Sequence, residues 1–156
     1  RKGAVVFRPT LEQFLAILEV HAKLEGQAAG LAARRLSATH ASALEAAVAA
    51  CDAHAQKHGD GAPDAYYQLN MDFHRVVAEA AGNPYLLDMI KTNARKLMAY
   101  YRARYHYKGV IATSAKEHRA IATLIFARDA KEAEAAMERH VSFDHVTALD
   151  LLAALS

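Results

Sequence analysis

Helix-breaking residues are scarce in this sequence, and their scarcity restricts the fold more than any other feature. Only three prolines and seven glycines occur in 156 residues, whereas alanine, the strongest helix former, is the commonest residue. From Thr10 onward, apolar residues recur at helical spacing. The length suits one domain of ordinary size. The sequence therefore predicts an all-α protein.

Capping residues and turn signals divide the chain into six expected helices. Thr10, Ser37, Asp64 and Asn83 are expected to cap the first four, and Pro84 suits a first helical position. The expected helices span about 10–36, 37–58, 64–82, 83–105, 113–127 and 130–155. Gly26 and Gly30 in the first helix are expected to mark close packing or a kink. Short connections favour an antiparallel bundle of about six helices with a pocket in its core.

Charge and cysteine content exclude several classes of protein. The formal net charge is only +2, from 19 Lys and Arg against 17 Asp and Glu, which is too even for an electrostatically driven nucleic-acid binder. Cys51 is the only cysteine, so neither a disulfide framework within the chain nor a cysteine zinc cluster can form. No apolar run approaches the roughly 18–20 residues of a membrane span. We expect a soluble, cytoplasmic protein.

Three of the nine histidines lie on apolar helical stripes. His74 follows Asn70 by one helical turn, so both face the same side of the third expected helix. His118 and His140 lie at equal sequence distances before and after Asp129, where a helical hairpin is expected to turn. They should therefore lie at the same height. If the third helix packs alongside, these side chains converge into a cluster of three nitrogens and one oxygen that suits Zn, Ni, Cu or Fe.

The alternative interpretation is structural, because a histidine on an apolar face is usually a hydrogen-bonded core residue. His54 and His58 are also one turn apart, but they flank a glycine-rich turn and are expected to lie at a solvated helix end. The remaining histidines, His21 included, form no constellation and are expected to be surface or packing residues.

Several ordered motifs resemble one family: the C-terminal FCD-type effector-binding domain of GntR-family bacterial transcription regulators. The resemblance covers nearly the whole chain. The segments that are similar to the family's motifs are Glu19–Glu25 with Leu31–Arg35, Asn70–His74, Ala80–Pro84, Glu117–Ile121 and Arg128–His140. The family usually has arginine where this chain has His21.

The resemblance implies a metal site and an acid-binding site. In the family, one Asp or Asn and three His bind a divalent metal, which here corresponds to Asn70, His74, His118 and His140. Zn or Ni is the expected metal, with Mn or Fe as further options. Small organic acids bind beside or onto the metal in the family. Asn70 stands where Asp is commoner, a departure that would weaken metal binding.

The resemblance also implies a winged-helix DNA-binding domain before this one. Residues 1–8, whose short β-branched run differs from all that follows, resemble the last strand of its wing, with an artificial extension as the alternative. Residues 9–156 would then form the helical effector-binding and dimerisation domain. Operator DNA would be contacted only through the missing N-terminal domain.

We therefore expect a non-enzymatic effector-sensing domain that binds a divalent metal and a small carboxylate. Arg95 and Arg102 are candidate effector-binding residues. A homodimer is expected, with apolar residues on the first and fourth helices available for its contact: Leu11, Phe14, Leu18, Leu86, Leu87 and Ile90. One alternative is a three-histidine metalloenzyme, a hydrolase or oxygenase, although its candidate base, Glu117, is expected to face away from His118. Another is a purely structural helical scaffold.

Overall fold

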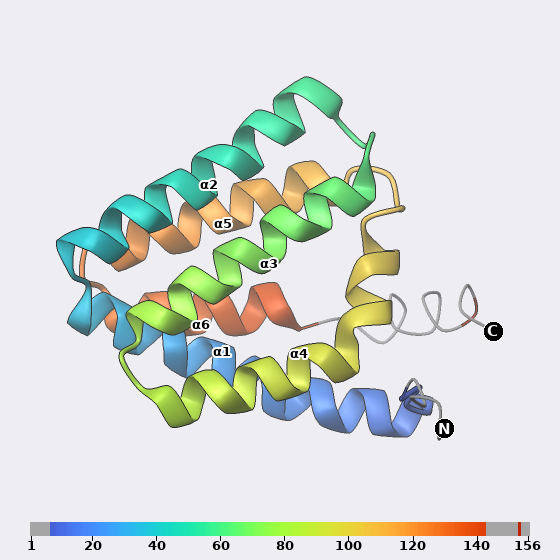
Figure 1. Ribbon diagram of the computed structural model, residues 1–156, viewed down its shortest axis with the longest axis horizontal. Coiled ribbons are helices and arrows are strands. Elements are labelled where there is room, and N and C mark those ends of the chain that lie inside the picture. The colour runs from blue at the N-terminus through green and yellow to red at the C-terminus, as the bar shows by residue number, and fades with distance from the viewer. Residues whose placement is uncertain (1–6, 143–152, 154–156) are drawn as a thin grey trace, which may run out of the picture.

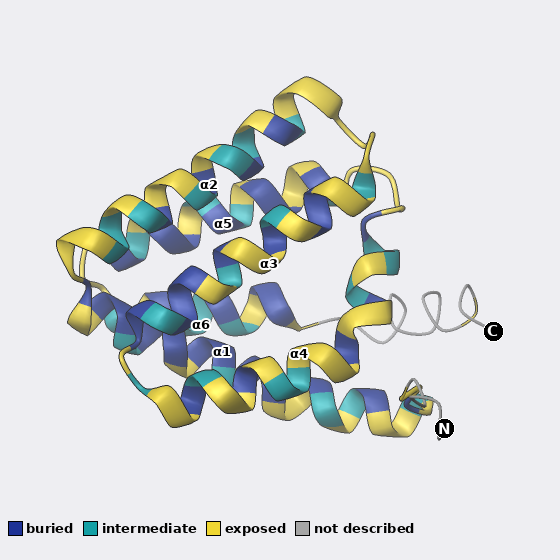
Figure 2. Ribbon diagram, viewed as in Figure 1, coloured by how far each residue is buried: buried dark blue, intermediate teal, exposed yellow. Residues whose placement is uncertain are grey.

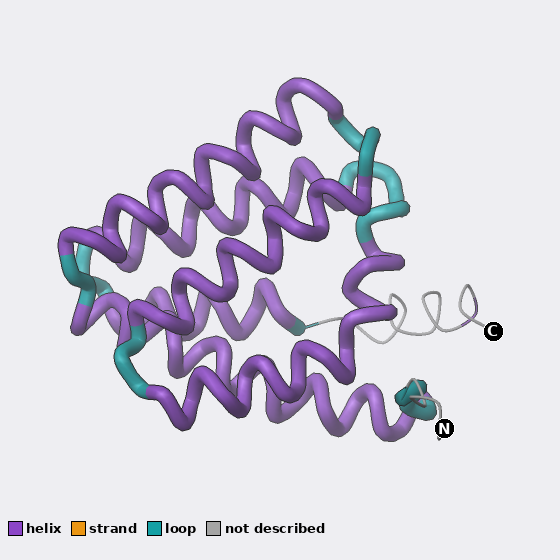
Figure 3. Tube along the Cα trace, in the orientation of Figure 1, coloured by secondary structure: helices purple, strands orange, loops and turns teal. Residues whose placement is uncertain are grey.

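The computed structural model describes residues 7–142 and residue 153, and these residues form an all-α bundle (Figures 1 and 3). The helices are α1 (Leu11–Arg35), α2 (Ala38–His58), α3 (Pro63–Ala80), α4 (Pro84–Arg104), α5 (Val110–Phe126) and α6 (Ala130–Val141). No strand occurs among the described residues. The all-α bundle predicted from the sequence is therefore confirmed.

Side-chain caps explain where most of the helices begin. Thr10, Ser37 and Asn83 each accept a backbone N–H bond at the start of α1, α2 and α4, as the sequence predicted. Asp129 does the same for α6. Pro84 occupies the first turn of α4, where its missing N–H removes no helical bond.

Two predicted helix starts are wrong. Asp64 does not cap α3, because the helix begins one residue earlier at Pro63, and its carboxylate binds Arg102 instead. α5 begins at Val110, earlier than the expected Thr113, directly after Gly109, whose φ of 79° places it in the left-handed region. The turn at the glycine therefore sets the start of α5.

Both ends of the chain fall partly outside the described residues. The wing strand expected in residues 1–8 lies largely in residues 1–6, which are not described. α6 is described as far as Val141, and its expected continuation to about residue 155 lies in 143–152 and 154–156, also outside the described part.

α1 lies along one edge of the bundle and makes its most extensive contact with α6 (Figure 1). It packs against α6, α3, α4 and α5, while α2 covers α3 and α5 on the other side (Figure 1). Buried residues line the inward faces of the helices, and exposed residues line their outer faces (Figure 2). Phe14, Phe73, Leu97 and Met137 are fully buried in the largest core cluster. This packing brings α1, α3, α5 and α6 together, the helices from which the candidate site is built.

α1 and α6 approach closely at two glycines. A Cβ at Gly26 would overlap Glu138 Cγ and lie 3.0 Å from the Glu134 carbonyl oxygen. At Gly30 a Cβ would lie 3.0 Å from Glu134 Oε2 and 3.3 Å from the Ala130 carbonyl oxygen. α1 is continuous through both positions. The glycines therefore serve close packing, one of the two roles expected for them.

Most of the apolar residues expected to contact a second copy are used within the chain. Phe14 and Leu18 of α1 are 0% and 4% exposed, and Leu86 and Ile90 of α4 are 2% and 4% exposed. The sequence argument that these side chains are available for a dimer contact is therefore wrong, because packing within the bundle covers them. The homodimer itself stays a prediction.

Tyr100 joins α4 to the segment that leads into α1. Its hydroxyl donates a buried hydrogen bond of 2.8 Å to the Pro9 carbonyl oxygen. Its ring lies against Phe14, with 4.2 Å between the ring centroids. The C-terminal half of α4 is thus tied to the start of α1.

Within the described part of the chain, none of the helices combines the length and apolar character that crossing a membrane requires.

Candidate metal centre and its cavity

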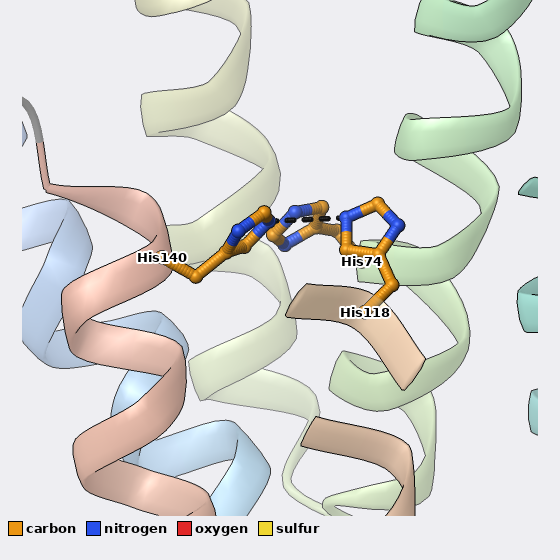
Figure 4. Close-up of side chains that lie close together, drawn as sticks. All are labelled: His74, His118 and His140. Atoms are coloured by element: carbon orange, nitrogen blue, oxygen red, sulfur yellow. Dashed lines mark hydrogen bonds between the residues drawn. The ribbon is translucent and has the colours of Figure 1, made fainter. Parts of the chain in front are cut away.

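Three histidines from three helices converge at one point in the core (Figure 4). His74 comes from α3, His118 from α5 and His140 from α6, and each offers a ring nitrogen within 4.8 Å of the other two. The Nε2 atoms of His118 and His140 are 3.0 Å apart. The α5–α6 hairpin turns at Asp129, so the two residues lie at the same height.

Burial keeps two of these imidazoles neutral. His118 is 0% and His140 4% exposed. Burial lowers the pKa of His140 to about 4, against the opposing effect of its hydrogen bond to Glu117. Burial, with the charges of the neighbouring histidines, also lowers the pKa of His118 well below its ordinary value. Both rings are therefore neutral at pH 7, the form that binds metal ions.

Asn70 offers a buried amide oxygen on the same helix as His74. It lies one turn before His74 on α3 and is buried. Its Oδ1 atom has no hydrogen-bond partner among the described residues. A buried polar atom without a partner costs free energy, so native proteins seldom leave one unless another group binds it.

The residues present fit a divalent metal ion. A metal–nitrogen bond to histidine is about 2.0–2.1 Å long. Two nitrogens bound to the same ion therefore lie about 2.9 Å apart when the nitrogen–metal–nitrogen angle is octahedral and about 3.4 Å apart when it is tetrahedral. The separation of 3.0 Å between the Nε2 atoms of His118 and His140 falls in this range. The three imidazoles therefore form a donor set that can hold such an ion, and the unpartnered oxygen of Asn70 is a candidate fourth donor.

Carboxylates contact the outer nitrogens of two of the histidines. The Nδ1 atom of His140 hydrogen bonds Glu117 Oε2, and the Nδ1 atom of His74 lies 3.2 Å from Glu25 Oε2. In both rings Nδ1 is therefore occupied and Nε2 is left for the centre of the cluster. The Nδ1 atom of His118 has no partner among the described residues.

Glu117 contacts the cluster through His140 rather than through its sequence neighbour His118. Consecutive helical residues do point about 100° apart, so Glu117 diverges from His118 on α5. However, α6 packs against this side of α5 and brings His140 to the Glu117 carboxylate. The contact of Glu117 is therefore determined by the packing of α6 against α5, and the direction of the side chain on α5 alone does not predict it.

Glu25 is a site residue that the sequence analysis missed. It is 2% exposed, and its Oε1 atom lies 3.4 Å from Nε2 of His21, which is likewise buried. Burial raises the pKa of the Glu25 carboxyl, but the charge of His74 and hydrogen bonds from both histidines outweigh burial and lower it well below its usual range. The signal in the sequence was a charged residue on the same apolar stripe of α1 as Leu18 and Ala22.

A cavity of about 310 Å³ adjoins the histidine cluster. His21, Glu25, Asn70, His74 and His140 line it and give it polar atoms. Its apolar lining includes Met71, Leu87, Ile90, Ala94, Met98 and Tyr101. Its volume is at the lower end of the range for small-molecule pockets, about 300–1,000 Å³.

Comparison with known proteins identifies the family. Residues 16–143 match the family model described as the FCD domain. The chain belongs to the FCD family. This domain is the C-terminal effector-binding domain typical of GntR-family regulators, as the sequence motifs indicated. A comparison with curated proteins finds no match for the chain.

The two arginines singled out from the sequence occupy different surroundings in this FCD domain. Arg95 is exposed and lines the cavity. Arg102 does not line it, because its guanidinium binds the Asp64 carboxylate through bonds of 2.7 and 2.9 Å. Arg104, which the sequence analysis missed, lines the cavity. Its positive charge also contributes to the lowered pKa of His140.

Proposed function

We propose that this FCD domain senses a small organic acid in a cavity that also holds a divalent metal ion. The observation that supports the proposal is the convergence of three imidazoles beside a cavity of ligand size, which His74, His140 and the unpartnered Asn70 line. Occupancy of the cavity would be transmitted to the DNA-binding domain of the same cytoplasmic regulator.

The metal ligands in this proposal are Asn70, His74, His118 and His140. Imidazole nitrogen suits Zn²⁺ or Ni²⁺ best, and Mn²⁺ or Fe²⁺ are further options. When bound, the metal supplies positive charge that attracts an anion. All four ligands are neutral in the metal-binding form, so the bound ion would keep its full charge of +2.

The effector in this proposal is a small carboxylate that binds beside or onto the metal. Arg95 and Arg104 line the cavity and can hold a second carboxylate or a hydroxyl group through paired hydrogen bonds. Arg102 is left out of the proposed set because its guanidinium binds Asp64. The apolar lining formed by Met71, Met98 and their neighbours would pack against the body of the acid.

We propose no catalytic role for this site. A metalloenzyme would need a general base beside a metal-bound water. Glu117, the nearest candidate in the sequence, hydrogen bonds the outer nitrogen of His140. Membership of a regulatory family also supports sensing.

The regulator would act as a homodimer, because a two-fold dimer matches the paired half-sites of bacterial operators.

Native mass spectrometry of protein purified without chelators tests the proposal. We expect one divalent metal ion per chain, together with retained acid in part of the sample. Calorimetry with a panel of small di- and hydroxy-acids then identifies the effector class.

His118→Ala is the deciding variant because it removes a fully buried ligand. We expect it to lose both metal and acid binding, whereas His58→Ala, at an exposed histidine of α2, retains both. Protein that purifies without stoichiometric metal, and that takes up neither Zn²⁺ nor Ni²⁺ when they are added, would refute the proposal.

A further inference from the structure

We propose that Glu25 is a positioning residue for the metal centre: its buried carboxylate holds His74 with Nε2 directed at the metal position. This inference rests on the metal site proposed above and assigns a role to a residue outside the ligand set.

Hydrogen bonding fixes the orientation of His74. Glu25 Oε2 lies 3.2 Å from Nδ1 of His74, and Glu25 Oε1 lies 3.4 Å from Nε2 of His21. An ionised carboxylate only accepts hydrogen bonds, so each imidazole must present an N–H to it. In the neutral form that binds a metal, His74 then carries its proton on Nδ1 and keeps the Nε2 lone pair for the ion. Carboxylates set the tautomer of metal-binding histidines in this way.

Glu117 provides a comparison within the same site. It contacts Nδ1 of His140 as Glu25 contacts Nδ1 of His74, but its side chain is 40% exposed, whereas that of Glu25 is 3% exposed. Water can therefore solvate the Glu117 carboxylate. Glu25 instead contacts His21 and His74 and borders the cavity.

Burial makes the Glu25 carboxylate depend on its hydrogen-bond partners. A charge taken out of water is costly unless its partners compensate it. His21 and His74 are those partners, so Glu25 and the imidazole of His74 constrain each other. A divalent ion bound through His74 would place further positive charge close to Glu25.

The proposal predicts that a neutral substitution of Glu25 weakens metal binding while the metal-free protein keeps its fold. In Glu25→Gln we expect Zn²⁺ affinity, measured by competition with a chromophoric chelator, to fall about 10- to 100-fold. The helix content of the metal-free variant, measured by circular dichroism, should equal that of the metal-free wild type. Glu19→Gln, an exposed glutamate on the same helix, should change neither quantity. Glu25→Asp keeps the charge but withdraws it by one methylene group, so it should also weaken Zn²⁺ binding.

Unchanged Zn²⁺ affinity in Glu25→Gln would overturn the proposal. So would a loss of affinity accompanied by a loss of helix content in the metal-free protein, because a purely structural residue would produce both.

A second measurement needs neither a variant nor a metal. The ¹⁵N chemical shifts of the imidazole nitrogens in metal-free wild-type protein report which nitrogen of His74 carries the proton. We expect the proton on Nδ1, and a proton on Nε2 would overturn the proposal. Failure of the wild type to bind Zn²⁺ or Ni²⁺ would instead refute the proposed function, so the two failures are distinguishable.

Discussion

At the scale of single residues, Asn70 determines the charge of the candidate metal centre. Its neutral amide leaves a bound divalent ion with one more positive charge than an aspartate would. Asn70→Asp should therefore tighten metal binding and weaken binding of the acid effector, each by about tenfold or ~1.4 kcal/mol. Calorimetry with Zn²⁺, and then with the acid on metal-loaded protein, measures both changes.

Asn70→Ala is the matched control for charge, since it removes the oxygen without adding an anion. We expect it to weaken metal binding. Tighter acid binding by Asn70→Asp would show that the electrostatic account of the cavity is wrong.

His140 should make the stability of the metal-free protein depend on pH. Burial lowers its pKa from 6.5 to about 4, so in the folded protein it resists protonation that the unfolded chain accepts. The stability it contributes is complete above pH 6.5 and is lost as the pH falls towards 4, by roughly 3 kcal/mol. Urea unfolding of metal-free protein across this range measures the loss. His140→Gln should have a shallower dependence, and equal slopes would contradict the assignment.

At the scale of helices, the contact between α1 and α6 depends on Gly26. Gly26→Ala should lower the free energy of unfolding, because the new Cβ overlaps Glu138 and crowds the Glu134 backbone at a cost of about 1–3 kcal/mol. This exceeds the gain of up to about 1 kcal/mol that alanine brings to a helix. Chemical denaturation measures both effects together.

Gly30→Ala should be milder, because the nearest atom there, Glu134 Oε2, is the end of a flexible side chain. If the Gly30 variant were the less stable of the two, the crowding argument would fail.

Local chemistry made the helices predictable, and their packing limited what could be predicted beyond that. Thr10, Ser37 and Asn83 cap helices as expected because capping depends on neighbouring residues alone. Asp64 was misassigned because α3 can begin at Pro63 without a side-chain cap, after Ala62 with a φ of 51°. An aspartate near a helix start was therefore insufficient to locate that start.

At the scale of the whole molecule, residues 1–156 should not bind DNA sequence-specifically. The balanced charge provides no continuous basic stripe, and the FCD family provides effector recognition. Electrophoretic mobility shifts at physiological salt, with a random-sequence duplex as competitor, test this prediction. Salt-resistant binding of one sequence by residues 1–156 would contradict it.

The candidate site was predictable only as far as sequence spacing determines distance. Equal separation from Asp129 brought His118 and His140 together, and one helical turn related Asn70 to His74. The contact of Glu25 with His74 requires α1 to pack against α3, which no spacing within either helix reveals. The same limit explains why Arg104 was missed while Arg102 was chosen, since only the packed bundle shows which side of α4 borders the cavity.

The hydrogen bond between Tyr100 and Pro9 couples α4 to the backbone just before α1. α4 forms one wall of the cavity, and the hydroxyl of Tyr100 on the same helix donates its hydrogen bond to the Pro9 carbonyl oxygen. A ligand that pushes this wall outward would pull on the Pro9 carbonyl, whereas one that draws the wall inward would slacken it. The position of the backbone just before α1 would then depend on what occupies the cavity.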